Sequence, residues 1–248
     1  KEYREELLFE IGVTKIKNMN IKVHTYTELT DKDKKSRPDG LIVVTSGKNN
    51  PIIEWIAFVE SKISTSELKL EQIERYIEFG RNIGIGEIVT ISNDLVTTPT
   101  DTPVEFLRKP GSFGLKHWSW TYLLVKAKRL IIENKIEDED HIYILNELKR
   151  YFNDSPKIRN YTSMKSKTWK SATEKIVHNT PTKEIVYDII DSYHQEEKDI
   201  SLQLSYHTVH HVKLLNNSKT SRKEVLTNML KNDKTIISKY HIDGNEKN

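Results

Sequence analysis

The spacing of apolar residues changes several times along the first part of the chain. Residues 3–11 carry apolar side chains at helical spacing, so we expect a short helix there. Residues 21–29 alternate between apolar and polar side chains, which predicts a strand. The apolar runs 41–44 and 52–63 flank the segment 46–51, which contains Gly, Asn and Pro. Such a segment between two strand-like runs indicates a β-hairpin with a long loop.

After residue 65 the period becomes helical. Leu70, Ile73 and Ile77 form one apolar stripe, and the pattern stops at Gly84, so we expect a helix that ends there. Residues 87–92 favour another strand. A strand, a helix and a strand in this order form a βαβ unit, which requires parallel pairing and a right-handed crossover.

The second half of the chain is mostly helical in pattern and highly charged. We therefore expect a core in residues 1–134 and a helical C-terminal region in residues 135–248 with a short β-containing tail. Further strands are expected at 104–107 and 114–117, and two strand-like runs lie within 202–242. Helices are expected at 119–133, 137–152, 166–177, 182–197 and 221–230.

Composition narrows the function classes. The 248 residues suffice for a sizeable core, and 39 basic against 36 acidic side chains give a formal net charge of only +3. Any basic surface for nucleic acid must therefore be local. The absence of cysteine excludes disulfides, thiolate zinc sites and a cysteine nucleophile, and it fits a cytoplasmic protein. No apolar run approaches the roughly 18 residues of a membrane span, so we expect no membrane partner.

Three charged residues fall at one end of the predicted hairpin. Glu60 and Lys62 follow an apolar strand and lie two residues apart, so they project from the same face. Opposite residues of an antiparallel hairpin have numbers with a constant sum. Pairing Asp39 with Glu60 centres the turn between Asn49 and Asn50, where the turn residues are. A loop of even length without a bulge would therefore bring the two carboxylates and the amine together, and a bulge would shift the pairing by one residue.

This arrangement suits phosphodiester hydrolysis. Carboxylate oxygens are hard ligands that hold Mg²⁺ or Mn²⁺. Such a metal polarises a phosphoryl oxygen and lowers the pKa of a bound water. A lysine ammonium stabilises the charge that develops on the phosphoryl group. The alternative is a strand-end salt bridge among the same three side chains, and the residues alone leave it open.

The motifs around these residues point to a known family. Arg37-Pro38-Asp39-Gly40 precedes Phe58-Val59-Glu60-Ser61-Lys62, and this order and spacing resemble the signature of the PD-(D/E)xK nuclease superfamily. The helix that follows contains Gln72 and Tyr76, which are similar to the Gln-x-x-x-Tyr element of RecB-type members. Their i, i+4 spacing puts both on one helical face.

The resemblance covers residues 21–120 and implies an α/β fold. The expected architecture is a restriction-endonuclease-like mixed sheet core of αβββαβ order, followed by the mostly helical C-terminal region.

The resemblance also assigns roles. It implies a Mg²⁺- or Mn²⁺-dependent nuclease that hydrolyses DNA. Asp39 and Glu60 are its expected metal ligands, with the Ser61 carbonyl as a third. Lys62 is expected to act at the phosphoryl group. Gln72 and Tyr76 are expected to contact the substrate.

Many members of this family supply one more acid from the helix before the first strand. Glu6 and Glu10 are candidates here. Glu28, at the end of a strand that should neighbour the Asp39 strand, is the rival that we favour. A merely solvated Glu28 is an equally open alternative.

A basic and aromatic segment lies in the C-terminal region. Lys165, Lys167 and Lys170 stand near Tyr161 and Trp169, as in surfaces that track phosphates. We hypothesise that these lysines add to the affinity for DNA. The alternative is that they are solvated lysines on an ordinary helix, and we favour this alternative.

Other readings of the chain stay open. A catalytically inactive nuclease-fold protein that binds or acts as a scaffold is one alternative function, and a nuclease acting on RNA is another. Both a monomer and a homodimer are open. His207, His210 and His211 have no nearby carboxylates that complete a metal site, so we expect them on a surface strand.

Overall fold

The computed structural model describes residues 1–29, 36–64, 66–104, 111–155, 158, 169–178, 182–216 and 220–243. The chain forms two compact units, residues 1–158 and 159–248. Helix α4 (Glu139–Asp154) belongs to the first unit, because its Leu145 packs with Ala127 and Leu130 of helix α3 (Trp120–Ile132). The first unit therefore extends past residue 134, where we had expected the core to end.

The first unit contains a mixed five-stranded sheet, which confirms the expected α/β class. Strands β1 to β3 are antiparallel neighbours, and β3, β4 and β5 run parallel to one another. The order across the sheet follows the order along the chain: β1 (Ile21–Thr27), β2 (Gly40–Ser46), β3 (Ile52–Ser61), β4 (Glu87–Ser92) and β5 (Gly114–Ser119). Of the predicted strand at 104–107, residues 105–107 lie outside the described part of the chain.

The hairpin register decides where the charged residues meet. Gly40 pairs with Val59 and Val44 with Trp55, so the residue numbers sum to 99, as expected for Asp39 opposite Glu60. The hairpin contains a bulge, because the register shifts between Val44 and Thr45. The extra residue lies on the turn side of these pairs, so the register at the other end of the hairpin is unaffected.

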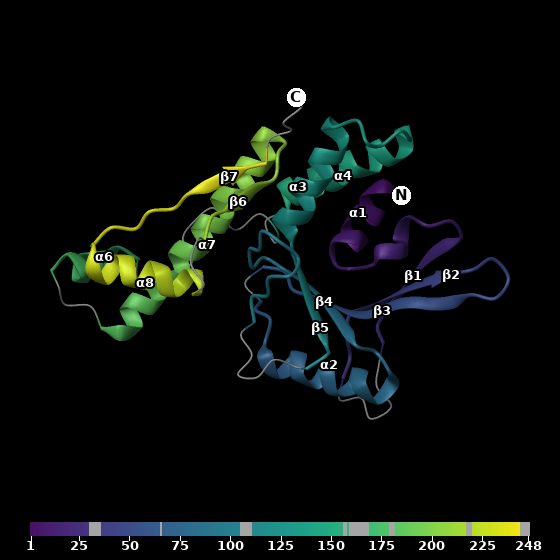
Figure 1. The fold of residues 1–248 in the computed structure, drawn as a ribbon, viewed down its shortest axis with the longest axis horizontal. Helices are drawn as coiled ribbons and strands as arrows, with labels where there is room; N and C mark the ends of the chain where they lie inside the picture. The colour runs from purple at the N-terminus through teal and green to yellow at the C-terminus, as the bar shows by residue number, and fades with distance from the viewer. Residues whose placement is uncertain are drawn as a thin grey trace. The chain divides into compact units, whose positions relative to one another are not determined.

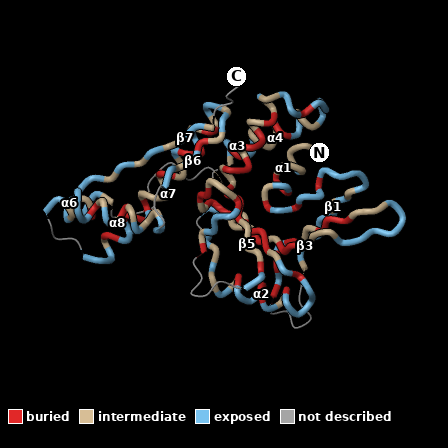
Figure 2. Tube along the Cα trace, viewed as in Figure 1, coloured by how far each residue is buried: buried red, intermediate tan, exposed pale blue. Residues whose placement is uncertain are grey.

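Helices cover both sides of the sheet. Figure 1 shows α2 (Leu70–Ile83) below it, and α1 (Glu2–Glu10), α3 and α4 above it. A short 3₁₀ helix (Thr14–Lys17) follows α1. Figure 2 shows buried positions gathered around β3 and β5, whereas the outer end of the hairpin is exposed.

The apolar stripe of α2 faces the sheet. Ile73, Tyr76 and Ile77 pack with Phe58 of β3 and Ile88 of β4, so the 3.6-residue period predicted from the sequence is confirmed. The helix ends at Gly84, which has a left-handed φ of 78° that glycine adopts without strain.

Gly80 lies where α2 comes close to Ile85 and to Phe58 of β3. A Cβ atom there would lie 2.6 Å from the carbonyl oxygen of Ile85 and 3.2 Å from the Phe58 ring. Glycine therefore lets α2 pack closely on the sheet.

The second unit is mainly helical. Its elements are α6 (Trp169–Val177), α7 (Lys183–Thr208), β6 (Val212–Leu214), α8 (Arg222–Asn232) and β7 (Tyr240–Ile242), with β6 and β7 antiparallel. Residues 166–168 of the predicted helix at 166–177 lie outside the described part of the chain. Within the described residues, no helix is both long enough and apolar enough to cross a membrane.

One prediction for this unit is wrong. The segment that carries His207 is not a strand, because α7 continues to Thr208, whereas the two strand-like runs predicted within 202–242 match β6 and β7. His207 therefore lies on a helix rather than on a surface strand, and His210 and His211 lie between α7 and β6.

A buried carboxylate links three segments of the second unit. Glu197 of α7 is 1% exposed, and its oxygens accept hydrogen bonds from Arg222 Nε at 3.1 and 3.2 Å and from Ser238 Oγ at 2.5 Å. His194 Nδ1 lies 3.1 Å away. Burial raises the pKa of Glu197, but the hydrogen bonds from His194, Arg222 and Ser238 lower it by more, so the pKa lies below its ordinary value.

Candidate active site

Glu60 is a buried carboxylate at the end of β3. Its side chain is 2% exposed, and an ionised carboxylate at such a position needs partners. Oε1 accepts hydrogen bonds from Lys62 Nζ and, at 2.8 Å, from Gln72 Nε2. Oε2 accepts one from the Tyr76 hydroxyl at 3.0 Å. The sequence-predicted Lys62, Gln72 and Tyr76 therefore meet on one carboxylate.

Helix α2 supplies two of these partners from adjacent turns. Gln72 and Tyr76 are four residues apart, and Gln72 Nε2 also donates to the Tyr76 hydroxyl at 2.9 Å. The hydroxyl has one proton for two acceptors, Glu60 Oε2 and the Arg37 carbonyl oxygen at 3.0 Å. Burial, together with the nearby Glu60 charge, raises the pKa of Tyr76 to about 12, so the phenol stays neutral and remains a donor.

Asp39 lies beside Glu60 through the next residue along β3. Its Oδ2 accepts hydrogen bonds from the Ser61 backbone N–H at 2.8 Å and from the Ser61 hydroxyl at 3.0 Å. The Ser61 nitrogen is bonded directly to the Glu60 carbonyl carbon. The Asp39 carboxylate therefore contacts the peptide that follows Glu60, at the same end of the hairpin, and it is exposed to solvent.

The backbone of Lys62 is fixed from two sides. Its N–H donates to the Ile91 carbonyl at 2.7 Å, and its carbonyl accepts from Trp120 Nε1 at 2.9 Å. The side chain, 21% exposed, turns back to Glu60. Strand β4 and the start of α3 thus position the residue that carries the amine.

Asp39 and Glu60 are the two carboxylates at this site that could hold a cation. No group of three or more His, Cys, Asp or Glu side chains that could hold a metal ion exists among the described residues. Asp39 and Glu60 offer two carboxylates, and Mg²⁺ is usually held by one or two carboxylates, with waters and substrate phosphates as further ligands. A cation at Glu60 would compete with the ammonium of Lys62, because that ammonium contacts Oε1.

The candidate additional acids have other partners. The Glu28 backbone N–H donates to the Asp39 carbonyl at 3.1 Å, but the Glu28 carboxylate is exposed and pairs with Arg37 at 3.1 Å. Glu10 pairs with buried Lys126 and accepts from the Tyr122 hydroxyl at 2.7 Å. These contacts bring neither the Glu28 carboxylate nor the Glu10 carboxylate to the carboxylates of Asp39 and Glu60.

Glu6, the remaining candidate acid, also pairs with Lys126, at 3.3 Å. Glu6 and Glu10 of α1 are thus both engaged with Lys126 of α3.

The predicted basic segment of the C-terminal region is described only in part. Lys170 is exposed on α6, whereas Lys165 and Lys167 lie outside the described residues. Their contribution to DNA affinity stays a prediction.

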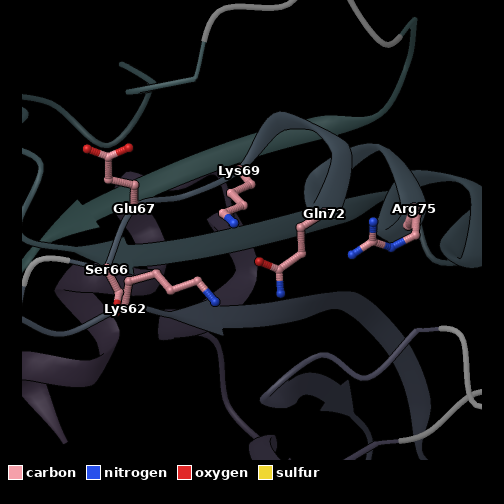
Figure 3. Close-up of a pocket in the computed structure, with 6 residues that line it drawn as sticks. All are labelled: Lys62, Ser66, Glu67, Lys69, Gln72 and Arg75. Carbon is pink, nitrogen blue, oxygen red and sulfur yellow. The ribbon is translucent and has the colours of Figure 1, made fainter.

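A cavity of about 630 Å³ opens beside the Glu60 cluster. It is lined by Lys62, Ser66, Glu67, Lys69, Gln72 and Arg75. Figure 3 shows the amines of Lys62 and Lys69, the Gln72 amide and the Arg75 guanidinium directed into one space, whereas the Glu67 carboxylate points away.

Lys69 and Arg75 are two residues that the sequence reasoning missed. The signal was their spacing, since each lies three residues from Gln72 and so on a neighbouring position of the helix surface.

Comparisons with protein-family models, with curated proteins and with solved structures found no match for this chain.

Proposed function

We propose that this protein is a magnesium-dependent nuclease that hydrolyses DNA phosphodiester bonds, with a site of the PD-(D/E)xK type. One observation carries the proposal. Asp39 is hydrogen-bonded to the peptide that follows buried Glu60, and Lys62 contacts Glu60 itself. The order α1-β1-β2-β3-α2-β4 also supports it, because it is the αβββαβ order that the resemblance implies.

The roles follow from the contacts. Asp39 and Glu60 would hold Mg²⁺ or Mn²⁺, with the Ser61 carbonyl as a further ligand. When bound, the metal supplies Lewis-acid polarisation of a phosphoryl oxygen and lowers the pKa of a water. Ser61 holds the Asp39 carboxylate through two hydrogen bonds. The Lys62 ammonium, partly exposed next to the cavity, is placed to stabilise negative charge on the phosphoryl group.

Gln72 and Tyr76 act on Glu60 rather than on the substrate in this proposal. Both donate to its oxygens, so they fix the orientation of the carboxylate. Gln72 also lines the cavity.

A structural salt bridge is the main alternative, and two features favour a functional site. A stable strand end does not require a buried ion pair, because apolar residues of similar volume are often as stabilising or more so. The Glu60 carboxylate also has three donors from two elements, which is more than a simple pair with Lys62 needs. The choice of DNA over RNA comes from the family resemblance.

Cleavage by Asp39→Asn tests the proposal. We expect wild-type protein to cleave plasmid or duplex DNA in Mg²⁺ and not in EDTA. Asp39→Asn should keep its fold but lose activity at least about 100-fold, because metal-dependent stabilisation supplies several kcal/mol and each 1.36 kcal/mol is a factor of ten. Asp101→Asn, at an exposed position of the same unit, is the matched control.

Two outcomes would contradict the proposal. One is undiminished cleavage by Asp39→Asn in protein free of contaminating nuclease. The other is wild-type protein that cleaves no DNA in Mg²⁺ or Mn²⁺. An RNA substrate assayed in parallel separates the alternative nuclease from an inactive scaffold.

A further inference from the structure

The cavity beside Glu60 carries an excess of positive charge. Lys62, Lys69 and Arg75 line it together with one acid, Glu67, whose carboxylate points away from the space that the cations share (Figure 3). The ammonium of Lys62 is already paired with Glu60. The uncompensated positive charge therefore comes from Lys69 and Arg75.

Neither of these two side chains has a hydrogen-bond or ion-pair partner within the described part of the chain. For Arg75 this is informative, because Glu71 lies four residues before it on α2, at a spacing that permits an ion pair. No such pair forms between the two. The guanidinium is instead directed into the cavity.

We propose that Lys69 and Arg75 form a phosphate-binding subsite for a DNA strand, next to the phosphodiester that is cleaved. This inference rests on the proposed nuclease function and adds the group that holds the substrate beside the reacting bond. The phosphate is either an internal phosphodiester of the strand or a terminal phosphomonoester, since both present the same anionic oxygens.

The chemistry of the two side chains suits this ligand. A guanidinium donates two parallel N–H groups to phosphate oxygens, and an ammonium adds a compact positive charge. Lys69, Gln72 and Arg75 follow one another at three-residue spacing, so donors are available along one side of α2. Lys62 joins the cavity to Glu60, so a strand bound by Lys69 and Arg75 lies beside the proposed catalytic carboxylates.

The test is the salt dependence of DNA binding by the full chain in EDTA, where cleavage does not occur. The probe is a fluorescently labelled 20-base-pair duplex, and the readout is anisotropy between about 50 and 250 mM KCl. The double variant Lys69→Ala/Arg75→Ala is compared with Lys22→Ala/Lys48→Ala. The control removes the same charge from exposed positions on β1 and in the hairpin loop.

Each lost phosphate contact should flatten the log–log salt slope by about 0.9. We expect the Lys69/Arg75 variant to lose about 1.8 units of slope and to bind about 60-fold more weakly at 0.1 M salt, with a much smaller change in the control. The variant Lys69→Gln/Arg75→Gln keeps more of the aliphatic side chains and should show the same loss of slope and affinity. It replaces the alanine variant if that variant fails to fold.

Duplexes with 5′-phosphate and 5′-hydroxyl ends identify the source of the phosphate. A loss of affinity on both duplexes indicates an internal phosphodiester, and a loss only on the phosphorylated duplex indicates a terminal group. A slope equal to that of the control variant overturns the subsite, as does a wild-type chain with no measurable affinity for either duplex. A chain that binds through these residues but cleaves nothing in Mg²⁺ refutes the proposed nuclease function and leaves the subsite intact.

Discussion

Replacing Lys62 with Ala separates a catalytic lysine from a structural ion pair. The Lys62 ammonium contacts Glu60 Oε1, one of the oxygens that we propose as a metal ligand. Ammonium and metal therefore compete for the same carboxylate. If the site binds Mg²⁺, Lys62→Ala should bind it more tightly than the wild type does, while cleaving DNA more slowly.

The structure sets the size of this effect. Two unit charges about 4 Å apart attract by about 4 kcal/mol at an effective dielectric constant of 20. The Lys62 side chain is 21% exposed, so solvent screening reduces this attraction to a part of that value. Recovery of only about 1.4 kcal/mol lowers the Kd for Mg²⁺ tenfold. Loss of a group that stabilises transition-state charge should reduce kcat about 10²- to 10³-fold.

Stability should change in the same experiment. Without metal, Lys62→Ala leaves buried Glu60 with only the neutral donors Gln72 and Tyr76. We expect a loss of about 1–3 kcal/mol in the free energy of unfolding, since a buried charged group loses one partner. Added Mg²⁺ should restore stability in proportion to ln(1 + [Mg²⁺]/Kd), and more strongly than in the wild type.

Isothermal titration with Mg²⁺ and thermal unfolding with and without it measure both effects. Lys62→Arg is the matched control, because it keeps a cation beside Glu60 and should keep the wild-type Mg²⁺ affinity. An Mg²⁺ affinity that is unchanged or weaker in Lys62→Ala would refute the competition. Such a result would favour the alternative that Lys62 and Glu60 form a structural salt bridge.

Three further predictions concern stability. Because the pKa of Tyr76 is raised to about 12 in the folded protein, its contribution to the free energy of unfolding is fully present below about pH 10, the pKa of an unfolded tyrosine. The contribution is lost as the pH rises from about 10 to about 12. In urea unfolding, Tyr76→Phe should therefore lose less stability than the wild type between about pH 10 and pH 12. Glu197→Ala leaves the largely covered Arg222 guanidinium without its carboxylate and should cost about 3–5 kcal/mol. Because the pKa of Glu197 is lowered, this contribution in the wild type is present above about pH 4.5 and is lost as the pH falls below it. Gly80→Ala should cost about 1–3 kcal/mol in thermal unfolding, because its Cβ would meet the Ile85 carbonyl.

Much of the first unit was predictable because local signals agreed. The alternation in residues 21–29, the turn residues in 46–51 and the stripe on α2 each predicted the element that forms. The approach of Asp39 to Glu60 was predictable from the constant sum across the hairpin. The bulge was not predictable, because an extra residue leaves no trace in a strand whose side chains are apolar on both faces.

The prediction of a surface strand at His207 failed for a specific reason. Residues 202–206 alternate between large and small or polar side chains, as a strand does. In the helix, Ser201 and Ser205 are buried, and their hydroxyls donate to the Val212 and Ser201 carbonyls at 2.6 and 2.8 Å. Two serines four residues apart thus occupy buried helical positions that a hydrophobic pattern scores as exposed.

The side chains around the proposed site were predictable only where the backbone fixes them. Glu60, Lys62, Gln72 and Tyr76 follow from strand and helix periods. The direction of Glu28 depends on its left-handed φ of 57°, which is uncommon for a residue other than glycine and has no signal in the sequence.

The bulge between Val44 and Thr45 also bears on how the hairpin tolerates change. It lies between the hairpin loop and the paired residues next to Asp39 and Glu60. On the loop side of the bulge, the pairing is already shifted by one residue. Lengthening the loop near Asn49 would alter only the segment beyond the bulge. The hairpin tip is therefore a natural place to insert a tag or a reporter domain, since an insertion there leaves the Asp39–Ser61 contact in register.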